Sequence, residues 1–181
     1  RRPQCPVSLR KQVTSPKSEN ECLVPRLLTG KGEVTYMGRD SAFMPTVLVS
    51  GCYDLLHAGH IAFFREAASY GKLYVSVGSD CNIEILKGKR PVFSEAERLF
   101  IVKSIRYVED AFIGSGTGML DFEPDLRRLK PDYLIVNEDG HTEEKRLLCE
   151  SLGVTYKILE RIPAEGLPVR ASSTLKKDLG L

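Results

Sequence analysis

The sequence has no long apolar segment and no excess of charge of one sign. No run of residues approaches the roughly 18 to 20 apolar positions that a transmembrane helix needs, and no apolar signal-peptide core follows the N-terminal arginines. The 26 basic and 24 acidic residues leave a net charge of +2, which gives no general attraction for a polyanion. We therefore expect no insertion into a membrane and no nucleic-acid partner.

Paired cysteine motifs are also absent. The five cysteines form no CxxC pair, and an odd number fits a secreted disulfide framework poorly. This pattern favours a reducing compartment, so we expect a cytoplasmic protein. No cluster of side chains has the spacing of a metal cage, so we predict no metal site made by the protein. The chain begins with arginine and not with methionine, and we expect it to be part of a longer polypeptide or a processed one.

Composition changes near residue 45. Residues 1–45 hold five of the ten prolines, with eight basic and four acidic residues, and show no period of 2 or 3.6. We interpret them as an extended N-terminal arm or linker. The remaining 136 residues, 46–181, are enough for a single domain with one sizeable core.

Short apolar runs alternate with helix-length segments after residue 45. The predicted strands are 46–50, 73–78, 110–114, 132–137 and 155–159, and the predicted helices lie near 59–70, 80–86, 95–106, 121–130, 141–152 and 172–179. Ser94 and Glu97 have the spacing of a capping box at the start of one helix. Continuous apolar strands imply burial on both faces. We therefore predict an α/β fold: a doubly wound, Rossmann-like parallel sheet of about five strands with helices on both faces.

The join between the first strand and the first helix carries an unusual group of residues. The stretch SGCYDLLHAGH places two of the three histidines, His57 and His60, near the start of the predicted helix. Gly59 between them permits close approach of a ligand to the backbone. The first strand-to-helix turn of such a sheet is a favoured place for phosphate, so these residues predict an anion site.

The same residues resemble a known family. HAGH behind VSGCYD is similar to the HxGH signature of the cytidylyltransferase-like nucleotidyltransferases. KGKRPVFSEAER (87–98) resembles the family's lysine loop and the helix after it, RYVEDAFI (106–113) its YVD strand, and ASST (171–174) its late ISTT motif. HxGH alone is a weak pattern, whereas four motifs in the family's order are specific, and they span about 46–178.

The resemblance implies a reaction and roles for individual residues. A phosphate oxygen of an acceptor attacks the α-phosphate of a nucleoside triphosphate, and pyrophosphate leaves. His57 and His60 would hold phosphate oxygens, and Lys87, with Lys89 second, would place a cation between acceptor phosphate and α-phosphate. Arg98 would clamp the acceptor phosphate. Mg²⁺ is implied as the triphosphate's companion, bound mostly by phosphate oxygens and water.

Further positions follow from the matched motifs. Ser172, Ser173 and Thr174 would offer hydroxyls and free amides to the triphosphate. The predicted nucleotide-binding set is Gly51, Cys52, Tyr53, Gly59, Asn137, Asp139, Arg161, Ser172, Ser173 and Thr174. The insertion between Arg161 and the late motif lets either Arg161 or Arg170 fill the family's arginine position. Asp54 either orients acceptor hydroxyls or caps its turn, and Lys89 and Arg98 complete the predicted acceptor set.

Each of these motifs also has an ordinary structural interpretation. SST is also typical of a helix cap, and KGKR is also typical of a solvated loop. GSGTG (114–118) lacks the GxGxxG spacing of a nucleotide-binding loop, so we interpret it as a flexible turn. NEDG (137–140) is either a solvated turn or a contact to base or ribose. Cys52 is better explained as a small buried residue than as a nucleophile.

The resemblance leads to the following expectation of function. The chain transfers a nucleoside monophosphate from CTP or ATP to a phosphorylated small molecule and releases pyrophosphate. The form GCYD leans toward relatives that act on sugar phosphates, so a sugar or polyol phosphate is the favoured acceptor. The alternatives are a phospholipid head-group cytidylyltransferase, a cofactor-precursor adenylyltransferase and a non-catalytic nucleotide-binding domain. A homodimer is expected from the resemblance.

Overall fold

The computed structural model describes residues 44–180, so the predicted arm lies outside the described residues except for Met44 and Pro45. The strands are β1 (Thr46–Gly51), β2 (Lys72–Val77), β3 (Asp110–Ile113), β4 (Tyr133–Asn137) and β5 (Thr155–Leu159). The α-helices are α1 (Ala58–Ala67), α2 (Asp80–Lys87), α3 (Glu95–Lys103), α4 (Glu123–Leu129), α5 (Glu143–Leu152) and α6 (Ser172–Asp178). Three short 3₁₀ helices are η1 (Ala68–Tyr70), η2 (Gly118–Leu120) and η3 (Glu138–Gly140).

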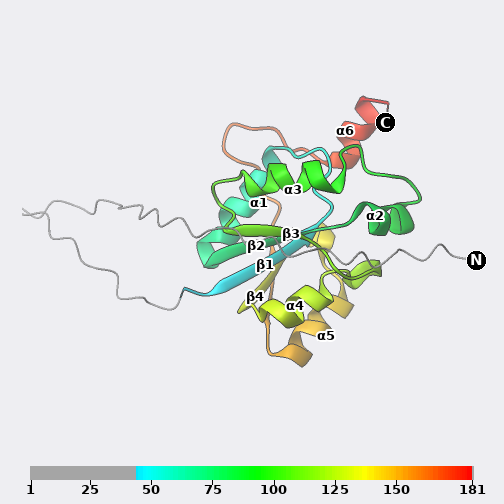
Figure 1. Cartoon of the computed structure of the whole chain (residues 1–181). Coiled ribbons are helices and arrows are strands. Elements are labelled where there is room, and N and C mark those ends of the chain that lie inside the picture. Colours follow the sequence, from blue (N-terminus) through cyan, green and yellow to red (C-terminus); the bar gives the residue numbers. More distant parts are fainter. Residues whose placement is uncertain (1–43, 181) are drawn as a thin grey trace, which may run out of the picture. The chain divides into compact units, whose positions relative to one another are not determined.

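The strands form one parallel sheet in the order β3-β2-β1-β4-β5, which confirms the predicted fold class. Figure 1 shows helices on both sides of this sheet. The apolar run of β1 is continuous because both of its faces are covered: Val47, Leu48 and Val49 are all fully buried.

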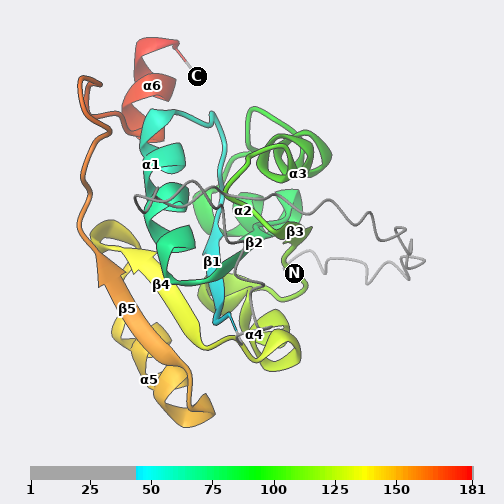
Figure 2. The same ribbon diagram turned by 90° about the vertical axis from the view of Figure 1, so that its left-hand side faces the viewer.

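The two faces of the sheet have separate cores. Val47 and Val49 pack in one cluster with Phe64 of α1 and Val102 of α3. Leu48 points the other way, into a cluster with residues of α4 and α5. The view in Figure 2 shows α1 and α3 apart from α4 and α5, as these clusters require. Alternation along β1 therefore divides the helices into two layers.

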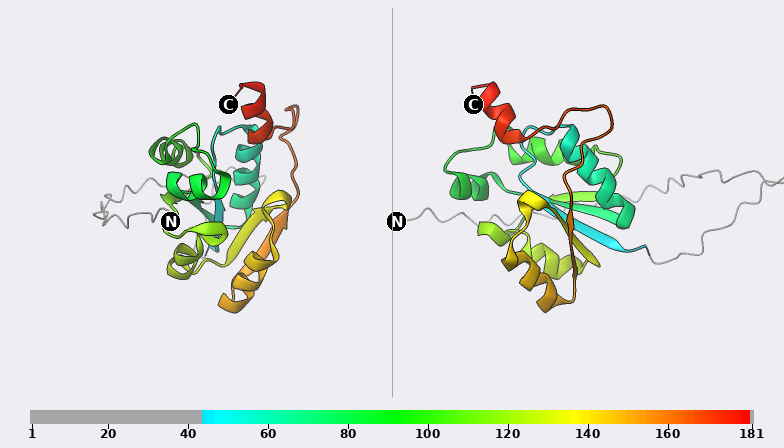
Figure 3. Two further views of the ribbon diagram at one scale, coloured as in Figure 1. Left: turned by 90° about the vertical axis from the view of Figure 1, so that its right-hand side faces the viewer. Right: turned by 180° about the vertical axis from the view of Figure 1, so that it is seen from behind.

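The strand order fixes where a ligand can bind. The chain runs from β1 outward to β2 and β3, then returns past β1 to place β4 and β5 on its other side. This reversal leaves a crevice beyond the carboxyl ends of β1 and β4. The last helix, α6, lies at that end of the sheet beside the start of α1 (Figure 3), and the Arg170 carbonyl oxygen is 3.6 Å from a Cβ built at Gly59.

The helix ends follow local sequence signals. The Ser94–Glu97 capping box is present at the start of α3, with the Ser94 backbone N–H donating to Glu97 over 2.9 Å. Gly153 ends α5 at φ 69°, a left-handed conformation that suits glycine. The helix predicted for 59–70 divides into α1 and η1. Within residues 44–180, no helix combines the length and apolar character needed to cross a bilayer.

Candidate active site

A cleft of about 790 Å³ opens beyond the carboxyl ends of β1 and β4. Its volume lies within the range of small-molecule sites. Fourteen of the residues predicted from the sequence line it: Gly51, Cys52, Tyr53, Asp54, His57, Gly59, His60, Lys87, Lys89, Asn137, Asp139, Arg161, Ser172 and Ser173. The structure therefore brings residues from four separated motifs to one place, and only Arg98 and Thr174 of the predicted set are not among the lining residues.

The two histidines form the first turn of α1. His57 is the N-cap, and its Nδ1 accepts the backbone N–H of Gly59 over 3.1 Å, while Nδ1 of His60 accepts the backbone N–H of His57 over 3.3 Å. This is a capping box in which imidazoles replace the usual hydroxyl and carboxylate. The rings stack with centroids 4.0 Å apart. The spacing of HxGH thus has a local structural reason as well as a chemical one.

The capping bonds fix the tautomer of both rings. A neutral imidazole whose Nδ1 accepts a hydrogen bond carries its proton on Nε2. Nε2 of His57 is buried without a protein partner. Burial, with the charges of Arg161 and Arg170, lowers the pKa of His57. Burial, with His57 and Arg161, lowers the pKa of His60 to about 3. Both histidines are therefore neutral N–H donors near neutral pH, suited to phosphate oxygens and not to proton abstraction.

Acid should destabilise the fold through these rings. In the unfolded chain His60 binds a proton below about pH 6.5, whereas in the folded chain it does so only near pH 3. Between these values the unfolded state holds more protons, so the free energy of unfolding should fall by about 1.4 kcal/mol per pH unit on acidification. The variant His60→Asn should lose that contribution, and urea unfolding at pH 7, 6 and 5 measures it. The same substitution at exposed His141 is the control, and equal slopes for wild type and His60→Asn would contradict the assignment.

The loop that leads into α1 is held in an uncommon backbone conformation. Tyr53 and Leu55 both have φ 51°, which residues with a Cβ rarely adopt. A Cβ built at Gly51 would lie 2.9 Å from Cζ of Tyr53, so glycine is needed there for the tyrosine ring to lie over the backbone. Strain of this kind persists only where the surroundings fix it, as at ligand sites.

Asp54 connects three segments around the cleft. Its carboxylate accepts the backbone N–H groups of Val92 and Phe93 over 2.9 and 3.1 Å, and it pairs with Lys176 of α6 over 2.6 Å. Asp54 is buried, with an exposed fraction of 3%. These bonds engage both carboxylate oxygens, so Asp54 holds the lysine loop and α6 in place. Asp54 also lines the cleft, and a contact to acceptor hydroxyls stays a prediction.

Arg98 is not among the lining residues of the cleft. Arg98 was expected to clamp acceptor phosphate, but its exposed fraction is 0%. Its guanidinium donates to the carbonyl oxygens of Phe93 and Cys52 over 3.0 and 2.6 Å and pairs with Asp80 over 2.7 Å. Every nitrogen of the group is therefore directed at the protein, and Arg98 positions the β1–α1 loop against the lysine loop.

Lys87 and Lys89 lie on the cleft from the α2 side. Lys87 is the last residue of α2, and Gly88 follows at φ 68°, which turns the chain into the lysine loop. Both lysines are exposed and line the cleft. Ser172 and Ser173 open α6 and also line the cleft, whereas Thr174 is exposed and is not a lining residue.

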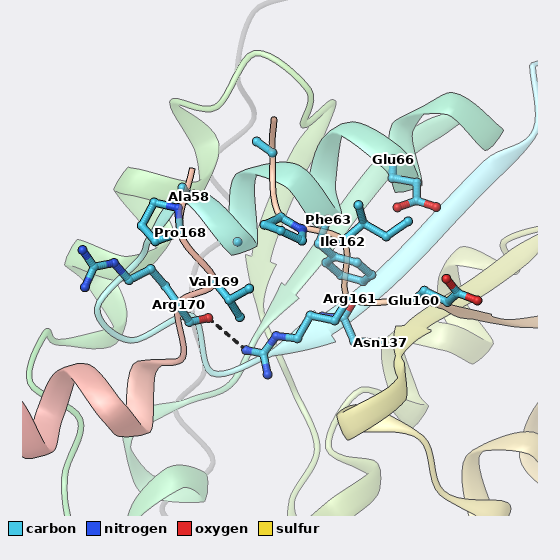
Figure 4. Close-up of a pocket in the computed structure, with 13 residues that line it drawn as sticks. Ala58, Phe63, Glu66, Asn137, Glu160, Arg161, Ile162, Pro168, Val169 and Arg170 are labelled. Atoms are coloured by element: carbon cyan, nitrogen blue, oxygen red, sulfur yellow. Dashed lines mark hydrogen bonds between the residues drawn. The ribbon is translucent and has the colours of Figure 1, made fainter. Parts of the chain in front are cut away.

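Asn137, Asp139 and Arg161 form the β4–β5 side of the site. Arg161 pairs with Asp139 over 3.2 Å and donates to the Arg170 carbonyl oxygen over 3.3 Å. Asn137 and Arg161 also border a second, smaller pocket, which shares Gly59 and Phe63 with the cleft as well. Figure 4 shows the Phe63 ring beside Ile162 and the guanidinium of Arg161 reaching the carbonyl of Arg170. Of the two arginines that the sequence left open, Arg161 lines both the cleft and the smaller pocket, whereas Arg170 borders only the smaller pocket.

Several residues of the cleft were missed in the sequence. Lys145, Lys176 and Lys177 all line it, from the first turn of α5 and from α6. Each lies in a charged stretch that is typical of a solvated helix face, and no sequence pattern distinguishes these lysines from ordinary surface lysines. Within residues 44–180, no group of three or more His, Cys, Asp or Glu side chains is arranged to hold a metal ion.

Comparison with known proteins agrees with this geometry. The family model described as cytidylyltransferase-like matches residues 48–175. The chain is 37% identical over 105 residues to the FAD synthase of Methanohalophilus mahii, covering 58% of this chain and 70% of that protein. It is 34% identical over 121 residues to the FAD synthase of Pyrococcus horikoshii, covering 65% of this chain and 79% of that protein.

A solved structure gives the same result for the fold. The lipopolysaccharide core biosynthesis protein from Thermoplasma volcanium GSS1 superposes with a TM-score of 0.57 at 30% sequence identity, over 67% of this chain and 99% of that one. The parallel sheet, the HxGH turn and the cleft lined by residues of the HxGH, lysine-loop and late motifs define a Rossmann-like nucleotidyltransferase. The chain belongs to the cytidylyltransferase-like family, as the motifs predicted.

Proposed function

We propose that this chain transfers the adenylyl group of ATP to FMN, forming FAD and pyrophosphate. The observation that carries the proposal is the likeness to FAD synthases over 70 to 79% of their length, including a chain 37% identical in the matched region. The cofactor-precursor alternative raised by the sequence is therefore better supported than the favoured sugar or polyol phosphate.

The chemistry requires donors placed around phosphorus. A phosphate oxygen of FMN forms the new bond to the α-phosphorus of ATP while the bond from that phosphorus to the bridging oxygen breaks, and pyrophosphate carries the electrons away. The phosphate of FMN is a nucleophile near neutral pH, so no base is needed. The Nε2–H groups of His57 and His60 donate to oxygens whose charge rises during transfer. The fixed, neutral rings need no reorganisation to do so.

Lysine side chains and the start of α6 complete the charge stabilisation around the phosphates. Lys87 and Lys89 meet the two reacting phosphates from the α2 side, and Ser172 and Ser173 take the outer phosphates with the free amides of α6. Asn137, Asp139 and Arg161 contact the nucleoside. Mg²⁺ would neutralise triphosphate charge, and the donor set fits an ion that phosphate oxygens and water hold, since the described residues offer no cage.

The sugar-phosphate interpretation remains the second candidate. It is favoured by the GCYD form of the loop and by the likeness to the lipopolysaccharide core biosynthesis protein of Thermoplasma volcanium. The homodimer expected from the resemblance also remains a prediction, which sedimentation equilibrium tests.

Product analysis decides between the candidates. The purified chain with Mg²⁺, ATP and FMN is expected to form FAD and pyrophosphate in equal amounts, measured by chromatography and by a coupled pyrophosphate assay. CTP with FMN, and ATP or CTP with heptose phosphate and glycerol phosphate, are the matched controls. Turnover of a sugar or polyol phosphate without FAD formation would overturn the proposal in favour of the second candidate.

A further inference from the structure

The last helix, α6, is attached to the rest of the fold in an unusual way. It has seven residues, none of them buried, yet Ser172, Ser173, Lys176 and Lys177 line the cleft. Helices in proteins are stabilised mainly by the apolar face that they bury, and a helix this short is not stable alone. Contacts other than those of a hydrophobic core must therefore hold α6 against the cleft.

The segment before α6 does not anchor the helix by packing. Residues 160–171 join β5 to α6 without a helix or strand, and none of them is buried. Figure 3 shows them as a long connection from β5 to α6. Arg161 donates to the Arg170 carbonyl oxygen over 3.3 Å, which ties the two ends of the connection together but does not reach the helix. The position of α6 thus depends on the side chains of the helix itself.

One side chain of α6 makes a strong contact with the domain. Lys176 pairs with the carboxylate of Asp54 over 2.6 Å, and among residues 44–180 this is the only ion pair that α6 forms. The Lys176 side chain is 15% exposed and that of Asp54 is 2% exposed. Solvent and salt therefore weaken this pair much less than they weaken an exposed one.

Asp54 is a fixed and charged partner for this lysine. Burial opposes the charged form, but the hydrogen bonds from Lys176 and from the backbone N–H groups of Val92 and Phe93 lower the pKa of the carboxyl. Val92 and Phe93 lie at the end of the lysine loop. The same carboxylate thus joins α6 to the lysine loop, so the segments that bring serines and lysines to the cleft share one anchor.

We propose that Lys176 is a positioning residue: its pair with Asp54 holds α6 closed over the cleft, in the arrangement that binds the nucleoside triphosphate. When the pair is broken, α6 moves away with its serines, because the helix has no buried face to retain it. The triphosphate binds the closed arrangement, so its apparent affinity falls with the fraction of closed molecules. The inference rests on the proposed function in naming ATP as that triphosphate.

The variant Lys176→Met removes the charge and leaves an unbranched side chain. The Kd for ATP, measured by calorimetry with Mg²⁺ and without FMN, should rise about 10-fold. Trypsin cleavage after Arg161 and Arg170, followed by mass spectrometry, should become about 10-fold faster, because the connection is released together with the helix. Saturating ATP should return the cleavage rate to the wild-type value.

The kinetic constants distinguish positioning from catalysis. Lys176→Met should have a KM for ATP about 10-fold above wild type and a kcat within about 2-fold of it, because saturating ATP closes α6 again. Lys176→Arg keeps a cation that can pair with Asp54, so it should restore the Kd for ATP and the cleavage rate.

The matched control is Lys103→Met. Lys103 also pairs with an aspartate, Asp110, over 2.8 Å, but this pair is exposed and neither residue lines the cleft. The variant should bind ATP and resist trypsin as wild type does.

The outcomes separate this inference from the function on which it rests. A higher Kd for ATP with unchanged cleavage would overturn the inference, because Lys176 would then contact the nucleotide directly. A large fall in kcat at saturating ATP, or an unchanged Kd for ATP in Lys176→Met, would overturn it as well. If the variants show the expected effects on ATP but the wild-type chain forms no FAD, the proposed function fails and the role of Lys176 stands. Wild-type chain that does not bind ATP would overturn both.

Discussion

Replacing His57 by asparagine is expected to lower kcat about 10²- to 10³-fold while leaving the fold intact. The amide oxygen of asparagine stands where Nδ1 stands and can still accept the backbone N–H of Gly59, so the cap of α1 survives. The donor at Nε2, which has no partner within the protein, is lost. Turnover with saturating substrates and urea unfolding of the same samples measure the two effects.

His57→Ala is the matched comparison. It removes both the donor and the cap, so it should lose the same catalytic factor and in addition about 1 kcal/mol of unfolding free energy. If His57→Asn keeps more than a tenth of wild-type turnover, the histidine serves the helix and not the reaction. The two substitutions therefore distinguish a structural from a chemical reason for the same residue.

Replacing Arg98 by methionine is expected to cost about 3 kcal/mol of unfolding free energy, although the residue does not line the cleft. The change leaves the partly buried carbonyl oxygens of Phe93 and Cys52 without this donor and separates Asp80 from its cation. The side chain of Asp80 is 36% exposed, so water can recover part of its solvation. The loss should therefore lie at the lower end of the range for broken buried pairs.

Urea unfolding of Arg98→Met beside Arg127→Met measures this effect. Arg127 pairs with Glu123 on the surface of α4, where such a pair contributes about 0 to 1 kcal/mol. If the two variants lose equal stability, the Arg98 network does not hold the loops. A purely catalytic role for Arg98 would instead give a stable variant with reduced turnover.

The fold could be predicted because its signals are local and repeated. Apolar runs of strand length that are buried on both faces, as in Val47, Leu48 and Val49, require helices on two sides and a parallel sheet. Ser94 caps the start of α3 and Gly153 caps the end of α5, and both residue types are common at such positions. The boundary errors, such as the division of 59–70 into α1 and η1, arise where a helix continues as a tighter turn whose residues have no distinct composition.

Residues of the candidate site could be predicted only where they belong to a short sequence motif. The histidine pair and the serines of α6 stand in short patterns, and the structure brings them to one cleft. The protein partners of Arg98 and Asp54 could not be predicted, because a sequence does not show which side chains a charged group pairs with. Lys145 was missed for the converse reason: its neighbours along the chain are ordinary surface residues, and its surroundings come from α4 and the β4–α5 turn.

The last segment of the fold differs from the rest in what it contributes. The sheet is complete at Leu159, and α6 contains no buried residue, yet residues after that point supply Arg161, Ser172 and Lys176 to the cleft. Ligand contacts here are thus largely uncoupled from the cores that hold the sheet together. Most substitutions in this segment should therefore cost little unfolding free energy, with Lys176, which pairs with the buried Asp54, as the exception, so the segment can vary in sequence while the scaffold stays unchanged.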